Sequence, residues 1–224
     1  MLSIIIPTLN EEKNIEQTLL KIEKISQEVK LDVIIVDDNS QDKTIEKALQ
    51  FHSRIDLKIL KNKKNLGLGY ALTNGYNLSN SEFVMFLDAD LSIGKNDILN
   101  LIKSKSEDGI VIGSRYIAGS KIIGANKKKI LISYLLNFLV SKIFRLNIID
   151  ISHSFRIISK RIKLDSKNFS HPGFFWEITI NAKRNNFSLK EVPITFNERS
   201  LGISKNKSFL MLLSVIKSLI NIIK

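Results

Sequence analysis

Short apolar segments alternate with longer amphipathic ones through the first half of the chain, and this alternation limits the folds open to it more than any other feature. The apolar segments have the length of buried strands, and the amphipathic ones between them are long enough for helices. Strands that alternate with helices are typical of a parallel sheet covered by helices on both faces. We therefore predict an α/β domain with three layers and a mostly parallel sheet. The strands expected in this half are residues 2–6, 32–36, 57–60, 83–87 and 110–113.

The boundaries of the helices follow from capping residues. Asn10 or Thr8 is expected to cap a helix from about residue 11 to 28, and Ser40 to cap another through about residue 50. Further helices are expected from about residue 67 and near 97–105, and, in the second half, over 130–146 and 173–185. Residues 148–160 are expected to form a turn followed by a strand. Residues 188–196 are expected to form an edge or irregular strand, because Pro193 lies inside it.

Two aspartates, Asp88 and Asp90, directly follow the apolar segment 83–87. Unpaired carboxylates are costly to bury, but they suit Mg²⁺ or Mn²⁺, which often bind one or two carboxylates together with substrate phosphates. The segments at 7–11 and 36–40 also place polar residues, Asp38 among them, where a strand ends. Because parallel strands end at one edge of a sheet, these groups are predicted to form a site for a nucleoside diphosphate and its metal ion. Asp37 is expected to be a structural turn residue.

Other phosphate-binding signatures are missing from the sequence. No GxGxxG follows the first strand, and no Walker-type loop is present. The glycine pair Gly67 and Gly69 is expected to permit a tight turn, with direct ligand contact as the alternative. The chain contains no cysteine, so disulfides and thiolate metal sites are excluded.

The charge of the chain is uneven. Residues 1–118 hold 15 Lys and Arg against 17 Asp and Glu, whereas residues 119–224 hold 19 against 5. The second half is therefore expected to meet an anionic partner, either nucleic acid or a phosphate-bearing lipid surface. The start of the chain lacks the pattern of a signal peptide, so a cytoplasmic location is expected.

A series of motifs resembles the inverting glycosyltransferases of family 2 with the GT-A fold. These motifs are PTLNE (7–11), VDDNSQDKT (36–44), NLGLGYALTNG (65–75), LDADLS (87–92) and GSRY (113–116). Further on, DISHSFR (150–156) and EVPITFNERSLGISK (191–205) resemble segments of the subfamily of dolichol-phosphate mannose synthase and its bacterial polyprenol-phosphate relatives. The resemblance covers residues 2–205. It implies a catalytic domain over 1–205, followed by an amphipathic helix over 206–224.

The resemblance also implies roles for individual residues. It assigns Asp90 the metal ion, with Asp88 and Ser92 beside it. It assigns phosphate contacts to Arg115, Arg199 and Lys205, of which Arg115 and Arg199 join Asp90 as the catalytic set. The residues implied to bind the sugar nucleotide are Pro7, Leu9, Glu11, Val36, Asp38, Asp88, Ala89, Asp90, Arg199 and Lys205.

Two positions depart from the family pattern. Leu9 stands where the family usually has an aromatic residue, which leaves the donor base open between GDP-mannose and UDP-sugars. The TSG of the later motif is SHS here, formed by Ser152, His153 and Ser154. His153 is expected to be either a structural residue or a contact to a phosphate or hydroxyl.

The reaction predicted from these features is metal-dependent transfer of a sugar, most simply mannose, to a polyprenyl phosphate. Such an acceptor is already anionic and needs positioning by cations, whereas a sugar hydroxyl needs a general base. The nearest base is Glu177, without the aspartate that hydroxyl-using members of the family carry after it. A family 2 enzyme acting on a sugar hydroxyl is the alternative. A basic binding module is the third reading, but the carboxylates at the strand ends would repel nucleic acid.

Membrane contact is expected from two apolar segments flanked by lysines, at 130–146 and 209–224. Neither has the length of a spanning helix. We therefore expect a peripheral protein on the inner face of the membrane, with a membrane-anchoring partner subunit as a further option.

Overall fold

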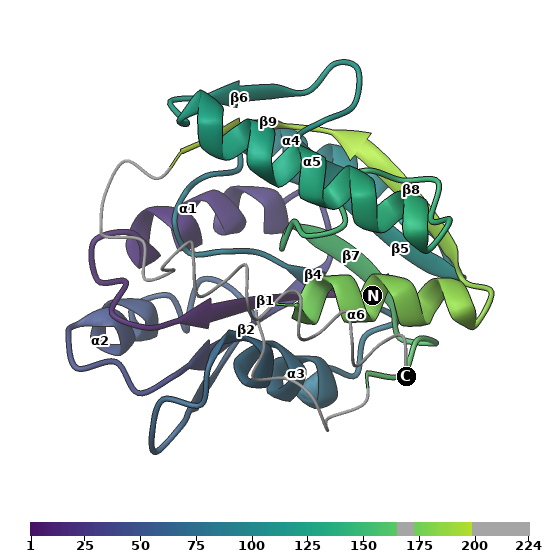
Figure 1. Cartoon of the computed structure of the whole chain (residues 1–224). Helices are drawn as coiled ribbons and strands as arrows, with labels where there is room; N and C mark the ends of the chain where they lie inside the picture. The colour runs from purple at the N-terminus through teal and green to yellow at the C-terminus, as the bar shows by residue number, and fades with distance from the viewer. Residues whose placement is uncertain (165–172, 199–224) are drawn as a thin grey trace.

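The computed structural model describes residues 1–164 and 173–198, which form a three-layer α/β domain (Figure 1). The predicted helix at 206–224 lies outside the described residues. The strands are β1 (Leu2–Thr8), β2 (Leu31–Asp37), β3 (Leu57–Lys61), β4 (Phe83–Phe86), β5 (Gly109–Ser114), β6 (Lys121–Ile123), β7 (Arg156–Ser159), β8 (Ser188–Pro193) and β9 (Thr195–Asn197). The helices are α1 (Ile15–Ser26), α2 (Thr44–Leu49), α3 (Leu68–Leu78), α4 (Lys95–Lys103), α5 (Lys127–Ile143) and α6 (Phe174–Arg184).

The main sheet has seven strands in the order β3-β2-β1-β4-β7-β5-β8. Strand β7 is antiparallel to both of its neighbours, and the other neighbouring strands are parallel. The predicted mostly parallel sheet is therefore confirmed. Strand β8, which contains Pro193, lies at one edge of the main sheet. An edge position was expected because proline has no backbone N–H to donate to a neighbouring strand. A small second sheet pairs β6 with β9, and β6 was not predicted from the sequence.

Two apolar cores lie on the two faces of the sheet because alternate residues of a strand point to opposite faces. Ile4 and Ile6 of β1 belong to the core that α1 and α4 cover, whereas Ile5 belongs to the core beneath α3 and α6. Gly75 of α3 allows that helix to approach the sheet. A Cβ atom there would lie 2.5 Å from Cγ2 of Ile5.

Strand β1 continues through Pro7 to Thr8, although it was predicted over residues 2–6, stopping before Pro7. Thr8 O accepts a hydrogen bond from Asp38 N, so the backbone of Thr8 points toward β2. Because the backbone groups of successive strand residues point to opposite neighbours, the backbone of Pro7 points toward β4. Pairing with β4 has already ended there, at Ile5 and Phe86. The missing N–H of Pro7 therefore interrupts no ladder.

Two predicted caps are wrong because their side chains bond elsewhere. Helix α1 begins at Ile15 after Asn14. Of the two residues predicted as its cap, Asn10 has a φ of 54° and accepts a bond from Gln41 N, and Thr8 donates its hydroxyl to Asp37 Oδ1. Helix α2 begins at Thr44, because Ser40 bonds to Asp37 and does not cap the helix.

Candidate active site

The carboxyl ends of β2, β1 and β4 lie next to one another at one edge of the sheet, because these strands are parallel neighbours. The three polar segments predicted to form a site therefore meet at that edge. Hydrogen bonds join the loop after β1 to the one after β2. Asn10 N donates to Ser40 Oγ at 2.8 Å, and Glu11 N donates to Thr44 Oγ1 at 2.8 Å. The first two loops are thus joined before any ligand binds.

Asp37 and Asp38 have different environments. The carboxylate of Asp37 is fully buried and accepts bonds from Thr8 Oγ1 at 3.0 Å, from Ser40 N at 2.9 Å and from the Ser40 hydroxyl. These contacts satisfy the carboxylate within the protein, in agreement with the structural role expected for Asp37.

Asp38 holds the loop between β3 and α3. Its Oδ1 accepts from Asn62 Nδ2 at 3.0 Å and from Leu66 N at 2.8 Å, and its Oδ2 accepts from Gly67 N at 2.7 Å. Gly67 has a φ of 93°, a conformation open to glycine without strain. This agrees with the tight turn expected at Gly67. Direct contact of Asp38 with a base or ribose stays a prediction.

The Asp88–Ala89–Asp90 segment turns sharply after β4. Leu91 has a φ of 63°, which is strained for a non-glycine residue and typical of functional turns. Ala89 is buried, and its carbonyl accepts from Thr18 Oγ1 at 3.1 Å. Asp90 Oδ1 accepts from Ser92 N at 3.1 Å. These bonds hold the backbone between the two carboxylates, at Ala89, and directly after them, at Ser92.

Ser154 donates a hydrogen bond to Asp88 Oδ2 at 2.6 Å. The contact follows from the register of β4 and β7. Because Phe86 lies opposite Arg156 in this antiparallel pair, extending the pairing by two residues places Ser154 opposite Asp88. In the sequence, Ser154 stands out only as a departure from the motif, and nothing local indicates its contact with Asp88.

The donor set at this turn fits a hard divalent cation. Within residues 1–164 and 173–198, no group of three or more His, Cys, Asp or Glu side chains could hold a metal ion by itself. Mg²⁺ and Mn²⁺ do not require one, because they commonly use one or two carboxylates and complete their shell with water and substrate phosphates. In the same described part, no hydrogen bond reaches the second oxygen of Asp90, Oδ2, which can therefore face a cation.

Arg115 forms a bidentate ion pair with Asp150. Its Nε and Nη2 donate to the two carboxylate oxygens at 2.8 Å each, and its backbone N donates at 2.9 Å. Burial raises the pKa of Asp150, but the bonds and charge of Arg115 outweigh burial and leave that pKa below its usual value. Arg115 was predicted to contact a phosphate, whereas here its Nε and Nη2 both bind Asp150. The other two predicted cations, Arg199 and Lys205, lie outside the described residues.

The segment that follows Asp150 is held by buried polar groups. His153 Nδ1 lies 2.7 Å from Gly113 O, and burial, reinforced by the charge of Arg115, lowers the pKa of His153 to about 3. The ring is therefore neutral at pH 7, which favours the structural role over a phosphate contact.

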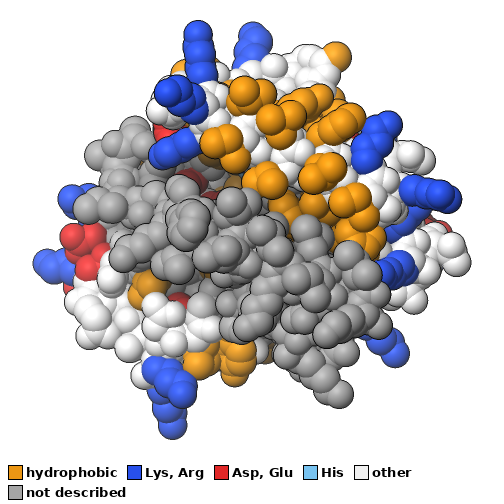
Figure 2. Space-filling view, viewed as in Figure 1, with side chains coloured by type: hydrophobic (Ala, Val, Ile, Leu, Met, Phe, Trp, Pro, Cys, Tyr) orange, Lys and Arg blue, Asp and Glu red, His pale blue; other side chains and the backbone are white. Residues whose placement is uncertain are grey.

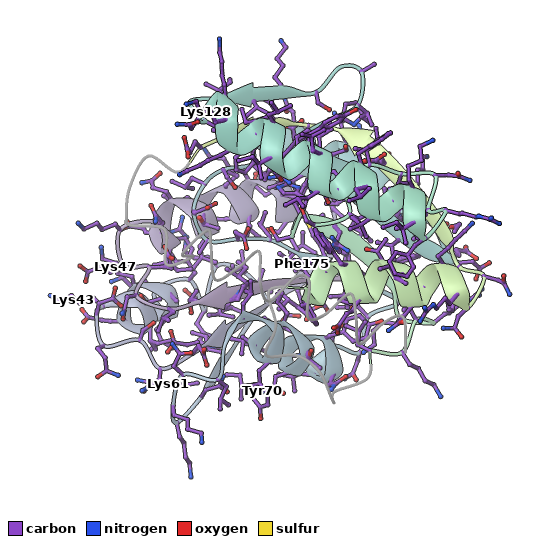
Figure 3. All side chains as sticks on the ribbon, in the orientation of Figure 1. Lys43, Lys47, Lys61, Tyr70, Lys128 and Phe175 are labelled. Carbon is purple, nitrogen blue, oxygen red and sulfur yellow. The ribbon has the colours of Figure 1, made fainter. Side chains whose placement is uncertain are left out.

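Arg156 is fully buried and ties this segment to α6. Its guanidinium donates to His153 O, to Ile151 O and to Thr179 Oγ1, and lies 4.8 Å from the ring centroid of Phe175, which Figure 3 labels at the start of α6. Sequence reasoning missed Arg156 and also Glu191, whose carboxylate accepts from the backbone N of Asp150 and Ile149 at 2.8 Å. Both residues lie inside recognised motifs, and that was the only available signal.

Residues 3–164 match the family model described as glycosyl transferase family 2. A dolichol-phosphate mannosyltransferase of Pyrococcus furiosus is 33% identical over 211 residues, 92% of this chain and 59% of the relative. A polyprenol monophosphomannose synthase of Mycolicibacterium smegmatis is 29% identical over 212 residues, 90% of this chain and 79% of the relative. The chain therefore spans less than two thirds of the Pyrococcus protein.

Solved structures support the fold. Glucosyl-3-phosphoglycerate synthase of Mycobacterium tuberculosis, in complex with Mn²⁺, UDP and phosphoglyceric acid, superposes with a TM-score of 0.73 at 16% identity, over 99% of this chain and 78% of the other. A structure of the same enzyme with Mg²⁺ and UDP gives 0.71 at 18% identity over 99% and 78%. At such identities the likeness concerns the fold, which is GT-A as the motifs implied.

Proposed function

Because the chain belongs to glycosyl transferase family 2, we propose that it transfers a hexose, most simply mannose from GDP-mannose, to a polyprenyl or dolichyl phosphate with inversion. The observation that carries the proposal is the meeting of Asp38, Asp88 and Asp90 at one sheet edge, in a chain whose curated relatives are named for this reaction. An acceptor phosphate oxygen forms a bond to the anomeric carbon, the bond to the donor diphosphate breaks, and a nucleoside diphosphate leaves.

On the donor side, the loop after β1 would line the pocket for base and ribose with Pro7, Leu9 and Glu11, and Val36 with Asp38 would complete it. Asp88 and the backbone at Ala89 would contact the sugar nucleotide. Arg199 and Lys205 would meet the diphosphate. The joined first and second loops support this arrangement, because a preformed pocket loses less entropy when a ligand binds.

Asp90 would hold the divalent ion, with Asp88 and Ser92 beside it, and the ion would neutralise the charge that builds on the leaving diphosphate. Among this chain's own residues, Ser92 N orients the Asp90 carboxylate, and Ser154 orients that of Asp88. Arg115 would act near the acceptor phosphate mainly by holding Asp150 and the segment after it.

A second candidate reaction is transfer to a sugar hydroxyl, which needs a general base. Glu177 of α6 is half-buried, and burial raises its pKa, which would suit a base at neutral pH. The lipid phosphate is the better supported acceptor, because it needs no base and both curated relatives are named for a polyprenol-type acceptor.

The acceptor lipid implies work at the cytoplasmic surface of a membrane. No helix in the described ranges is long and apolar enough to cross a bilayer. We assign residues 1–205 to the catalytic domain and 206–224 to an amphipathic appendage, with a membrane-anchoring subunit as a further partner.

The test is transfer of labelled mannose from GDP-mannose to a polyprenyl phosphate, followed by solvent extraction of the lipid product. Asp90→Ala is expected to reduce the rate about a hundredfold or more, because it removes the group proposed to hold the ion. The matched control is Asp108→Asn, which removes only an exposed ion pair with Arg161. Full activity of Asp90→Ala would overturn the proposal. Transfer to soluble sugars alone, lost in Glu177→Gln, would establish the second candidate.

A further inference from the structure

Helix α1 holds the turn after β4, residues 87–93, through two polar side chains. The hydroxyl of the buried Thr18 donates to Ala89 O at 3.1 Å, between the two aspartates of the turn. Nζ of Lys21 donates to Ile93 O, at the end of the turn. Because residues three apart lie on the same side of a helix, one side of α1 makes both bonds.

Lys21 is a cation whose side chain is turned toward the protein. On the face drawn in Figure 2, Lys and Arg side chains project from the surface into solvent. Lys21 is half-buried instead, with its ammonium group on a backbone carbonyl of the turn. Burial lowers the pKa of Lys21, and the negative charge of Asp90 partly offsets this effect. The ammonium group therefore lies in the field of the carboxylate that we propose as the ligand of the metal ion.

Lys21 and Asp90 act on each other without direct contact. The ion pairs formed among the described residues do not include these two. Within the same residues, only Oδ1 of Asp90 accepts a hydrogen bond, from Ser92 N at 3.1 Å. The charge of Lys21 is therefore close to Asp90, while the carboxylate keeps an oxygen with which it can bind a cation.

The charges at the turn determine when a divalent ion can bind. Asp88 and Asp90 attract the ion, and Lys21 repels it, because like charges raise each other's free energy. A nucleoside diphosphate brings further negative charge to the ion and offsets this repulsion. The ion should therefore bind weakly alone and more tightly together with the diphosphate. Such coupling is reciprocal, so the ion should strengthen binding of the diphosphate by the same factor.

We propose that Lys21 is a positioning residue that holds the turn and, through its charge, makes binding of the divalent ion depend on the donor diphosphate. The proposal rests on the proposed function, because the ion and the diphosphate are those of the sugar donor. A purely structural role of Lys21 predicts the opposite sign. Loss of a structural bond would loosen the Asp90 carboxylate and weaken ion binding, whereas loss of a repelling charge strengthens it.

The test measures Mn²⁺ binding to the full chain from the electron paramagnetic resonance signal of free Mn²⁺, without nucleotide and with GDP or UDP. Lys21→Gln keeps an N–H donor and removes the charge. It is expected to lower the Kd for Mn²⁺ alone about tenfold, and to reduce the factor by which the nucleotide lowers that Kd. Lys21→Arg keeps the charge and should match the wild type. Asp90→Ala removes the proposed ligand and identifies the part of the signal that comes from this site.

Two further variants separate charge from structure. Thr18→Val removes the other bond from α1 without a change of charge, and should raise the Kd for Mn²⁺ about threefold, equally with and without nucleotide. The matched control is Lys24→Gln, which removes an exposed lysine one turn further along α1 and should leave both values unchanged.

A Kd for Mn²⁺ that rises or stays the same in Lys21→Gln would overturn the proposal, and so would failure of every protein to bind Mn²⁺. The transfer reaction is judged separately, by labelled mannose in the lipid fraction of the wild type. If Mn²⁺ binding follows the expected pattern but no mannose is transferred, the proposed function fails and the role of Lys21 stands.

Discussion

At the scale of single residues, Ser154 places a hydroxyl where the related motif has glycine, and that hydroxyl bonds to Asp88 Oδ2. If Asp88 binds the sugar nucleotide, Ser154 is a positioning residue, because it orients a carboxylate without reaching the ligand. Ser154→Gly is therefore expected to raise the KM for the donor about five- to tenfold with a smaller change in kcat, since a hydrogen bond to a charged group contributes about 1.5–3 kcal/mol and water replaces part of it. Steady-state kinetics with varied donor would measure both constants.

The controls for this prediction are a rescue and a matched substitution. Ser154→Thr keeps the hydroxyl and should restore KM. Ser106→Gly removes a serine that precedes β5, at the amino end of that strand, and should leave KM unchanged. An equal KM in wild type and Ser154→Gly would mean that the Asp88 carboxylate needs no orientation from Ser154.

His153 gives a second prediction, on the pH dependence of stability. Burial lowers its native pKa to about 3, whereas an unfolded histidine titrates near its ordinary value of 6.5. Between these values the unfolded chain binds the extra proton, so the stabilisation is complete above pH 6.5 and falls as the pH drops toward 3. His153→Asn keeps a donor for Gly113 O but cannot titrate. Lowering the pH from about 7 to about 5 should therefore reduce the unfolding free energy of the wild type by about 2 kcal/mol more than that of the variant.

Urea unfolding at both pH values measures this difference. The other two histidines are the same in both proteins and cancel in the comparison. Parallel stability curves for wild type and His153→Asn would show that the ring can take up a proton in the folded protein.

At the scale of elements, the sequence predicts what local periodicity determines. The five strands expected in the first half lie within two residues of β1 to β5, because each is a dense apolar run that the sheet buries. The caps failed for a physical reason: Thr8, Asn10 and Ser40 are good capping residues, but at the sheet edge they bond across loops about thirty residues away or to the Asp37 carboxylate. Local preference cannot reveal which of these partners is nearer in the fold.

Long-range pairing explains the other omissions. Strand β6 has three residues, and its partner β9 lies far along the chain, so no local pattern indicates it. The same holds for Arg115, whose charge and motif suggested a phosphate, while the partner that the fold supplies is Asp150. The Ser154–Asp88 contact needed the register of β4 and β7, in which β7 runs antiparallel within an otherwise parallel sheet. The motifs identified the loops of the site, and the topology decides which side chains face a ligand.

At the scale of the whole molecule, both apolar cores are built on the same strands. Neighbouring residues of β1 and β2 contribute to opposite cores, so neither core can be lost while the sheet persists. Unfolding of the described domain is therefore expected to be one cooperative transition. A ligand bound at the sheet edge must then raise the melting temperature of the whole domain, which makes thermal shift a direct reading of donor binding.

This coupling gives the last prediction, which concerns the donor base. At about a hundred times its Kd, a donor stabilises the fold by about 2.7 kcal/mol, which corresponds to roughly 5–10 °C for a domain of this size. GDP-mannose with Mn²⁺ is expected to give this shift, and UDP- and CDP-sugars smaller ones. EDTA or Asp90→Ala should abolish it, while Asp108→Asn should retain it. A larger shift with a UDP-sugar would reassign the base, for which Leu9 offers no aromatic ring. No shift with any donor would contradict a nucleotide site at the ends of β1, β2 and β4.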